Sequence, residues 1–387
     1  MRKTLLLSCL LMGGLVAMAQ NPQHLTKAEA EEATAKLLAE RVEKVKQTQG
    51  ADWKAGELKN GNYRMKFIYK LFGEKPADGR ALYISMHGGG GTTPAANDQQ
   101  WENQKRLYNL KEGMYFVPRS PTDTWNMWHQ GYMDGFIDQI IENAVIYEGV
   151  NPNKVYIMGY SAGGDGTFQL APRLADHWAA ASMMAGHPND AQILSLRNLP
   201  FAIFMGGQDA AYGRNELARK WSKDLDALHK EDPDGYIHKV TIHEDCGHWM
   251  LNRDTVAIDW LYQYTRNPIP NKVVWVQDDI ARDNFYWLYA GPTGKLQGLN
   301  VTAEYDSETN TVNILRCDAP SVIIGLNDNM MDLDKPVTIK YEGNVVFKGK
   351  VSRKLQSIAE DVNAARGKDL IFPVKLKVMH GNIVTQL

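Results

Sequence analysis

The sequence has few cysteines, little net charge and no long apolar run after its first residues. Only three cysteines occur among 387 residues. Just Cys246 and Cys317 lie beyond the N-terminal segment, too few for a disulfide framework, so we expect two buried, unreactive thiols. No later segment approaches the ~18 consecutive apolar residues of a membrane helix. The formal net charge of −2 lacks the basic excess of a nucleic-acid-binding surface. These absences exclude a disulfide scaffold, a membrane span and a nucleic-acid partner.

The first 19 residues have the three parts of a secretory signal peptide. Arg2 and Lys3 form a charged start, residues 5–16 are apolar, and Ala-Met-Ala at 17–19 is a small-residue cleavage site. Lipoprotein processing at Cys9 is the weaker alternative, because the apolar run before it is short. We therefore expect an exported protein, periplasmic or secreted.

Apolar runs alternate with amphipathic stretches through residues 20–266. An Ala-, Glu- and Lys-rich stretch at 26–48 predicts a surface helix, and residues 63–69 a strand. Six further strands are predicted at 81–86, 114–118, 154–159, 179–185, 201–207 and 238–244. Helices are predicted at 98–109, 133–148, 163–174, 215–230 and 253–265. This alternation is typical of a doubly wound, mostly parallel α/β sheet covered on both faces.

The pattern changes after residue 266. "NPIPNK" (267–272) has two prolines in six residues and predicts a linker. Residues 271–387 then contain short β-branched or aromatic runs separated by turn signals, with one helix around 354–365. We expect a small all-β, sandwich-like C-terminal domain.

One serine lies at the junction of a predicted strand and helix, in "IMGYSAGGDG" (157–166). Ser161 directly follows the strand, and Gly159 and Gly163 have no β-carbon to obstruct a sharp turn. This context is the one a nucleophile elbow requires, although a lone G-x-S-x-G also fits a structural glycine-rich turn.

A second glycine run, "MHGGGG" (86–91), follows the predicted strand 81–86. Backbone N–H groups of such a loop can bind an oxyanion together with the N–H of Ala162. We predict Gly89 as the first donor and Gly90 as the alternative, with His87 holding the loop. A phosphate-binding loop is disfavoured because no Lys or Ser/Thr stands where a P-loop needs it.

The residues just after this loop are predicted to be structural. "NDQQWENQ" (97–104) begins a helix, with Asn97 as its N-cap. Asp98 and Trp101 are expected to support the fold.

An acid that orients the catalytic base is expected beyond the carboxyl end of another strand. Asp209, in "GGQD", follows the strand 201–207. Asp165 lies on the helix behind the serine, and Asp245 is too close to the candidate base. Asp209 is therefore the predicted acid.

The predicted base is His248, in the loop after the last strand of the sheet. His243 lies within that strand, and His187 precedes Asp209 in the chain. The order Ser, Asp, His leaves His248. Because four elements follow four different strands in this order, the elbow interpretation of Ser161 is preferred over the structural turn.

With these residues in place, the chain resembles α/β-hydrolases over residues 80–266, and more closely secreted esterases related to polyhydroxybutyrate depolymerases and feruloyl or acetylxylan esterases. The resemblance rests on "HGGGG", "GYSAGGDG", "GGQD" and "GHWM". It implies that Ser161 is acylated, His248 transfers its proton and Asp209 orients the imidazole, with no metal or organic cofactor. The sequence departs from the depolymerases in lacking a recognisable polymer-binding module, and from lipases in lacking an apolar lid.

Aromatic residues around the site suggest how an ester would be held. Residues 118–132 follow the strand 114–118 and should border the site. The predicted substrate contacts, able to stack on a sugar or an aromatic acid, are Trp125, Trp128, His129, His187 and Trp249. Tyr132, Tyr212 and Arg214 are further candidates. The alternative for the 118–132 loop is plain packing.

Three functions compete. The first is a carboxylic ester hydrolase acting on short-acyl or hydroxycinnamoyl esters, small or linked to plant polysaccharide. The second is a serine peptidase of the prolyl-oligopeptidase type, which shares the fold and triad order. Only about 60 mature residues precede "HGGGG", too few for the large N-terminal propeller of those peptidases. The third is a binding protein on a hydrolase scaffold, although such proteins typically lose the serine or histidine that this chain keeps.

Overall fold

The computed structural model describes residues 24–291, 296–379 and 383–387. The predicted signal peptide, with Cys9, lies outside these residues and stays a prediction. Within the described residues, none of the helices has the length and apolar character needed to cross a bilayer.

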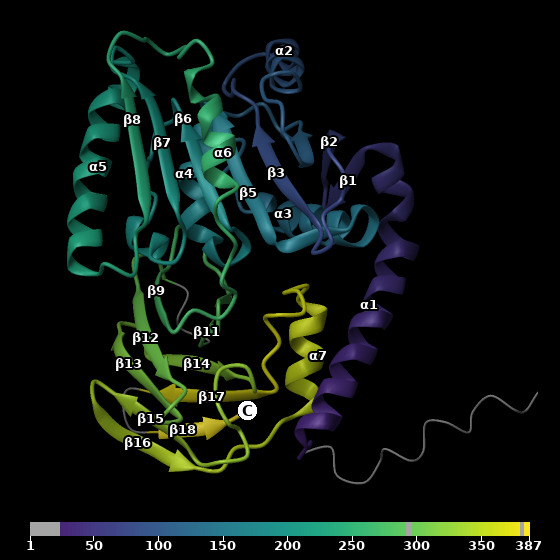
Figure 1. Cartoon of the computed structure of the whole chain (residues 1–387), viewed down its shortest axis with the longest axis vertical. Helices are drawn as coiled ribbons and strands as arrows, with labels where there is room; N and C mark the ends of the chain where they lie inside the picture. Colours follow the sequence, from purple (N-terminus) through teal and green to yellow (C-terminus); the bar gives the residue numbers. More distant parts are fainter. Residues whose placement is uncertain (1–23, 292–295, 380–382) are drawn as a thin grey trace, which may run out of the picture.

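An eight-stranded sheet forms the centre of the larger part of the molecule (Figure 1), in the order β1-β2-β4-β3-β5-β6-β7-β8. Its strands are β1 (Glu57–Asn60), β2 (Tyr63–Phe72), β3 (Arg80–Met86), β4 (Gly113–Pro118), β5 (Val150–Tyr160), β6 (Ala180–Met184), β7 (Phe201–Gly206) and β8 (His238–His243). Strands β3 to β8 run parallel, and β1 and β2 are antiparallel additions at one edge. The predicted α/β class and its mostly parallel sheet are confirmed.

Both faces of this sheet are buried. Along β3, Leu82 and Ile84 belong to one apolar core, whereas Ala81 and Tyr83 belong to the core on the opposite face. The first core includes residues of α3 (Tyr132–Asn143), α4 (Ala162–Arg173) and α5 (Arg214–Glu231); the second includes residues of α6 (Ala257–Leu261). Two-sided burial explains why the central strands are continuous apolar runs rather than alternating ones.

Several helix boundaries differ from the predicted ones. Helix α2 (Pro94–Gln104) is capped by the Thr93 side chain, with proline in its first turn, so the prediction of Asn97 as N-cap is wrong. Proline suits the first helical position because its missing N–H would be unpaired there anyway. Helix α3 continues as a π-helical turn, Ala144–Glu148. The helix predicted at 253–265 is a 3-10 turn, Arg253–Val256, followed by the short α6.

Helix α1 (Lys27–Ala55) is longer than the predicted 26–48 and spans both parts of the molecule (Figure 1). It starts with a capping box between Thr26 and Glu29. Near its C-terminus, Trp53 packs against rings of the main sheet such as Phe67 and Phe116. Its N-terminal half lies instead against α7 (Leu355–Asn363), in a small cluster of Ala30, Ile358, Val362 and Ile371. It therefore contacts both parts of the molecule, and the prediction of a surface helix on one domain was incomplete.

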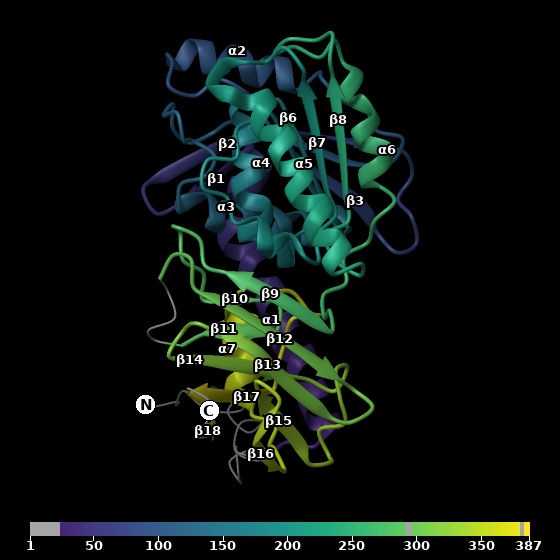
Figure 2. The same cartoon turned by 90° about the vertical axis from the view of Figure 1, so that its left-hand side faces the viewer.

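The C-terminal residues form two five-stranded sheets (Figure 2), confirming the small β domain. One has the order β10-β11-β14-β17-β18 and the other β16-β15-β13-β12-β9. The strands are β9 (Lys272–Val276), β10 (Asn284–Phe285), β11 (Leu288–Ala290), β12 (Asn300–Asp306), β13 (Thr311–Cys317), β14 (Ser321–Leu326), β15 (Val337–Tyr341), β16 (Asn344–Gly349), β17 (Val374–Met379) and β18 (Ile383–Gln386). Residues 262–271 join α6 to β9, but the predicted domain boundaries themselves stay predictions. Cys246 and Cys317 are free and buried.

Polar contacts connect the two parts. The carboxylate of Asp176, just after α4, accepts the backbone N–H of Tyr286 and pairs with His177. Burial alone would lower the pKa of His177, but the carboxylates of Asp176 and Asp138 outweigh it and raise this pKa to about 9. A cavity of about 790 Å³ lies beside these residues, among α1, α3 and the segment after α7, and its lining includes none of the predicted catalytic residues.

Candidate active site

Ser161 occupies a strained turn between β5 and α4. Its backbone has φ 58° and ψ −120°, a conformation that non-glycine residues rarely adopt. A β-carbon at Gly159 would lie 2.1 Å from the carbonyl oxygen of Gly163, and one at Gly163 would lie 2.1 Å from that of Met86. The two flanking glycines are therefore required for strand, turn and helix to pack this closely. The structure has the geometry of a nucleophile elbow.

Ser161, His248 and Asp209 form one continuous chain of hydrogen bonds. Ser161 Oγ lies 2.9 Å from His248 Nε2, and His248 Nδ1 lies 2.7 Å from Asp209 Oδ2. The carboxylate is buried, whereas 43% of the His248 side chain is exposed. The carboxylate fixes the tautomer with the proton on Nδ1, so Nε2 can accept the serine proton.

Tyr160, the residue before the serine, anchors the loop that carries the histidine. Its hydroxyl donates to the carbonyl of His248 (2.8 Å) and accepts from the N–H of Met250 (2.9 Å). Its ring also packs against Trp249, with centroids 5.5 Å apart. Sequence reasoning missed this role, because the residue between Gly and Ser is free in the G-x-S-x-G pattern.

The glycine loop after β3 runs beside Ser161. A β-carbon at Gly88 would lie 3.2 Å from Ser161 Cβ, and Gly89 has φ +102°. The N–H of Gly90 is already bonded to Asn97 Oδ1 at 2.8 Å, so the prediction of Gly90 as an oxyanion donor is wrong for this conformation. The N–H of Ala162 is the first of α4 and has no acceptor within the helix. Gly89 and Ala162 stay the predicted donors.

A chain of charged and amide groups supports this loop. Asn97 Nδ2 donates to Asp123 Oδ1, which also receives Arg119 Nη2 at 2.6 Å. Arg119 Nε bonds Asp98 at 2.8 Å. Asn97 is thus a loop-positioning residue rather than a helix cap. Asp98 has the structural role that the sequence predicted, as does Trp101, whose indole donates to a strand carbonyl.

His87 holds the base of the loop as a neutral imidazole. Its Nε2 accepts the N–H of Ser120, so Nδ1 carries the proton and donates to the carbonyl of Gly88 at 2.6 Å. Burial lowers the pKa of His87 to about 4. The predicted structural role of His87 agrees with these contacts.

The predicted substrate contacts divide into exposed and buried residues. Trp125 is 62% exposed and lies next to Gly90, and Trp249 is 47% exposed. Trp128 is fully buried and donates its indole N–H to the carbonyl of His87, so its prediction as a substrate contact is wrong. His129 is nine-tenths buried, with the Trp125 ring packed edge-on against it, so it supports Trp125 instead of meeting solvent.

His187 is half-buried and fixed by its neighbours. The backbone N–H of His187 donates to Asp165 Oδ1 (2.6 Å), and the ring Nδ1 accepts the backbone N–H of Asn189. The second contact leaves the ring proton on Nε2. Burial raises the pKa of Asp165. Asp165 thus holds the loop after β6 instead of orienting the base, as expected from its place on the helix.

Among the described residues, side chains close enough together to hold a metal ion occur in one place, at Asp190, Asp278 and Asp279. None of these residues belongs to the triad or to its hydrogen-bond partners. The hydrogen bonds from Ser161 Oγ to His248 Nε2 and from His248 Nδ1 to Asp209 suit nucleophilic attack assisted by an imidazole base.

No protein-family model and no curated protein matches the sequence. Solved structures resemble the chain at low identity. A thermostable esterase is 18% identical with a TM-score of 0.42, the match covering 54% of this chain and 62% of that one. A ferulic acid esterase is 13% identical (TM-score 0.40; 54% and 96%). Esterase 2 of Thermogutta terrifontis, phosphorylated by paraoxon, is 16% identical (TM-score 0.37; 54% and 91%).

The arrangement of the sheet and of Ser161 defines the fold. The sheet order with its antiparallel edge, the strained serine after β5 and the helix that follows it are features of the α/β-hydrolase fold.

Proposed function

We propose that the protein is a serine-dependent carboxylic ester hydrolase. The observation that supports this proposal most is the unbroken chain from Asp209 through His248 to Ser161, with the serine held on a strained elbow. A structural serine needs neither the strain nor a partly exposed histidine beside it.

In the proposed reaction, Ser161 Oγ attacks the ester carbonyl while His248 Nε2 takes its proton. The tetrahedral oxyanion accepts the N–H groups of Gly89 and Ala162. Loss of one such donor typically costs about 100- to 1,000-fold in kcat. His248 then protonates the leaving alcohol as the C–O bond breaks. Water, deprotonated by His248, attacks the acyl-enzyme and releases the acid.

The proposed substrates are short-acyl or hydroxycinnamoyl esters, either small or linked to plant polysaccharide. Trp125 exposes a large aromatic surface beside the glycine loop, and Trp249 exposes one beside Tyr160. Exposed indoles stack on sugars and aromatic acids. The signal-like pattern of residues 1–19 supports the further proposal that the protein is exported.

A fluorophosphonate probe tests the nucleophile. We expect stoichiometric labelling of the mature protein and none of Ser161→Ala, with Ser307→Ala, in an exposed turn, as a control that labels normally. An unlabelled wild type, or equal labelling of Ser161→Ala, overturns the proposal.

A substrate panel separates the ester hydrolase from the peptidase. Nitrophenyl acetate, methyl ferulate and acetylated xylan should be hydrolysed, and a proline-containing peptide should not. Cleavage of the peptide alone overturns the esterase assignment, and labelling without turnover of any substrate favours the binding protein.

A further inference from the structure

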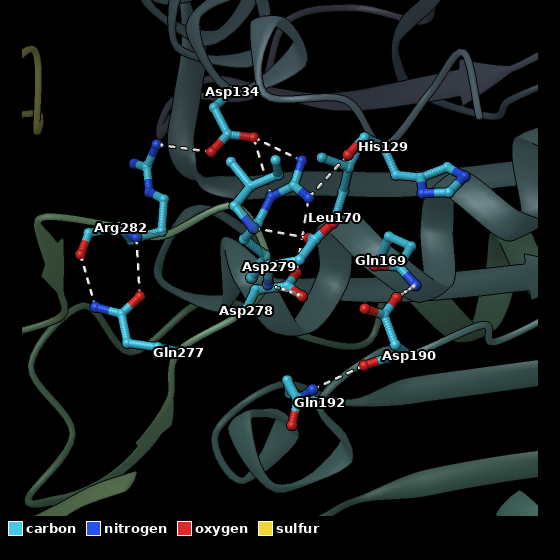
Figure 3. A network of polar contacts seen from close by, with 12 residues as sticks. His129, Asp134, Gln169, Leu170, Asp190, Gln192, Gln277, Asp278, Asp279 and Arg282 are labelled. Atoms are coloured by element: carbon cyan, nitrogen blue, oxygen red, sulfur yellow. Dashed lines mark hydrogen bonds and ion pairs between the residues drawn. The ribbon is translucent and has the colours of Figure 1, made fainter. Parts of the chain in front are cut away.

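Three aspartates from distant segments meet where the β domain contacts the main sheet's helices (Figure 3). Asp190 lies in the loop between β6 and the 3-10 turn Ile193–Leu196, and Asp278 and Asp279 follow β9. One carboxylate oxygen of each lies within 4.8 Å of the others. Carboxylates held this close repel one another unless a cation or a proton lies among them.

One buried oxygen of Asp278 has no hydrogen-bond donor. The residue is 3% exposed; Oδ1 accepts the N–H of Asp279, and Oδ2 has no hydrogen-bond partner. The nearest cation is Arg173, whose Nη1 lies 3.7 Å from Oδ2, beyond hydrogen-bond distance. That nitrogen already donates to the carbonyl of His129, and the other two guanidinium nitrogens both bond Asp134. A charged oxygen that is buried without a hydrogen-bond donor is unfavourable.

The charges of this network do not balance. Its acidic members are Asp134, Asp190, Asp278 and Asp279, and its basic members are Arg173 and Arg282. Both guanidiniums bond Asp134. Two negative charges are left over, which is the charge that one divalent cation would neutralise.

The surrounding groups hold the carboxylates in place without neutralising them. Amide groups of Gln169 and Gln297 donate to the two oxygens of Asp190, and the N–H of Ile280 donates to Asp279 Oδ1. Asp190 and Asp279 are exposed, so an ion can reach the cluster from solvent.

We propose that Asp190, Asp278 and Asp279 form a structural calcium site that links the loop after β6 to the β domain. The ligand set is entirely carboxylate oxygen, which favours a hard cation over zinc or copper. Calcium accepts irregular sets of six to eight oxygens that include carbonyls and water, whereas magnesium demands a near-ideal octahedron. The ion orders the segment that carries His187 three residues before Asp190, and it takes no part in the reaction at Ser161.

Calorimetric titration of the mature protein, stripped with EDTA, tests this site with CaCl₂ and MgCl₂ alone. We expect one calcium per chain, with a dissociation constant no weaker than the roughly 10⁻⁴–10⁻³ M of extracellular calcium modules, and at least tenfold weaker binding of magnesium. Asp278→Asn and Asp279→Asn should each weaken calcium binding at least 100-fold. Asp224→Asn, which removes an exposed carboxylate paired with Lys220 on α5, should bind as the wild type does.

Thermal unfolding separates loss of the site from loss of the fold. In EDTA, Asp278→Asn should unfold at the wild-type temperature or above it, because the substitution removes repulsion. In millimolar calcium, only the wild type and the Asp224→Asn control should gain a few degrees. If Asp278→Asn fails to fold, Asp279→Asn and Asp190→Asn decide the matter. No saturable calcium binding, equal binding by the variants, or equal affinity for magnesium overturns the proposal, and none of these readouts depends on esterase activity.

Discussion

The hydroxyl of Tyr160, at the end of β5, holds the loop that carries His248. Removing this hydroxyl should slow the proposed reaction and lower stability, while the protein still folds. Tyr160→Phe keeps the ring against Trp249 and deletes two hydrogen bonds, to the His248 carbonyl and from the Met250 N–H. Met250 is fully buried, so its N–H is left unpaired. Each lost partner of this kind costs about 1–3 kcal/mol.

The effect on rate follows from geometry. A His248 loop free to shift by about 1 Å misplaces the base, and displacements of that size cost roughly 100-fold. We expect kcat for nitrophenyl acetate to fall by about 10- to 100-fold, with KM changed little. Initial-rate assays give kcat and KM, and thermal unfolding gives the change in stability.

Tyr156→Phe is the matched control. Tyr156 lies on the same strand and donates one hydrogen bond to the carbonyl of Tyr264 at 2.8 Å, away from the triad. It should lose stability, of order 1 kcal/mol, and keep wild-type kcat. If both variants lose stability while kcat is unchanged in Tyr160→Phe, or if kcat falls equally in both, the hydroxyl has no positioning role and the reasoning fails.

Three further predictions follow from local geometry. Gly163→Ala should prevent folding or lower the unfolding temperature sharply, because its β-carbon would meet the Met86 carbonyl at 2.1 Å; a soluble variant of wild-type stability would contradict the elbow packing. Trp125→Ala should raise KM for methyl ferulate with stability unchanged, whereas Trp128→Ala should cost about 3–5 kcal/mol in denaturant unfolding; the reverse pattern would contradict their assigned places. The pKa of His177 is about 9 in the folded protein, against 6.5 in the unfolded chain. Its contribution to the free energy of unfolding, up to about 3 kcal/mol, is therefore complete below pH 6.5 and lost as pH rises through 9. Equal slopes of unfolding free energy against pH for the wild type and His177→Gln would refute this prediction.

The sequence allowed the linear features of the fold and of the candidate site to be predicted. Central strands buried on both faces are uninterrupted apolar runs, and the serine stands directly after one of them. The expected order of the triad then reduced ten histidines to His248. The structure brings Ser161, Asp209 and His248 into hydrogen-bond contact, although their catalytic role awaits the labelling experiment.

Side-chain direction could not be predicted in the same way. Trp125 and Trp128 stand three residues apart in one loop, and composition gives no means of telling the exposed ring from the buried one. Asn97 was assigned to a helix cap although Thr93 and Pro94 carry the stronger start signal. The Thr-Pro pair identifies Thr93 as the N-cap, but it does not predict the contact between Asn97 and the glycine loop.

Contacts between segments far apart in the sequence could not be predicted. Strands β7, β8 and β9 lie between Asp190 and Asp278 in the chain, and no spacing pattern connects the two residues. The partner of α1 could not be predicted either, because an amphipathic composition does not identify α7 as the helix it packs against.

The reach of α1 has a consequence for the order of assembly. Leu25 pairs with the backbone of Arg353, and the first turns of α1 cover α7, so residues near the start of the chain complete their packing only with residues near its end. Such distant pairings close late, because the loop entropy between them is lost before any contact compensates it. A chain truncated after α6 would leave the N-terminal half of α1 with its apolar face in water. Deleting residues 24–38 would in turn loosen the β domain while sparing Trp53 and the main sheet.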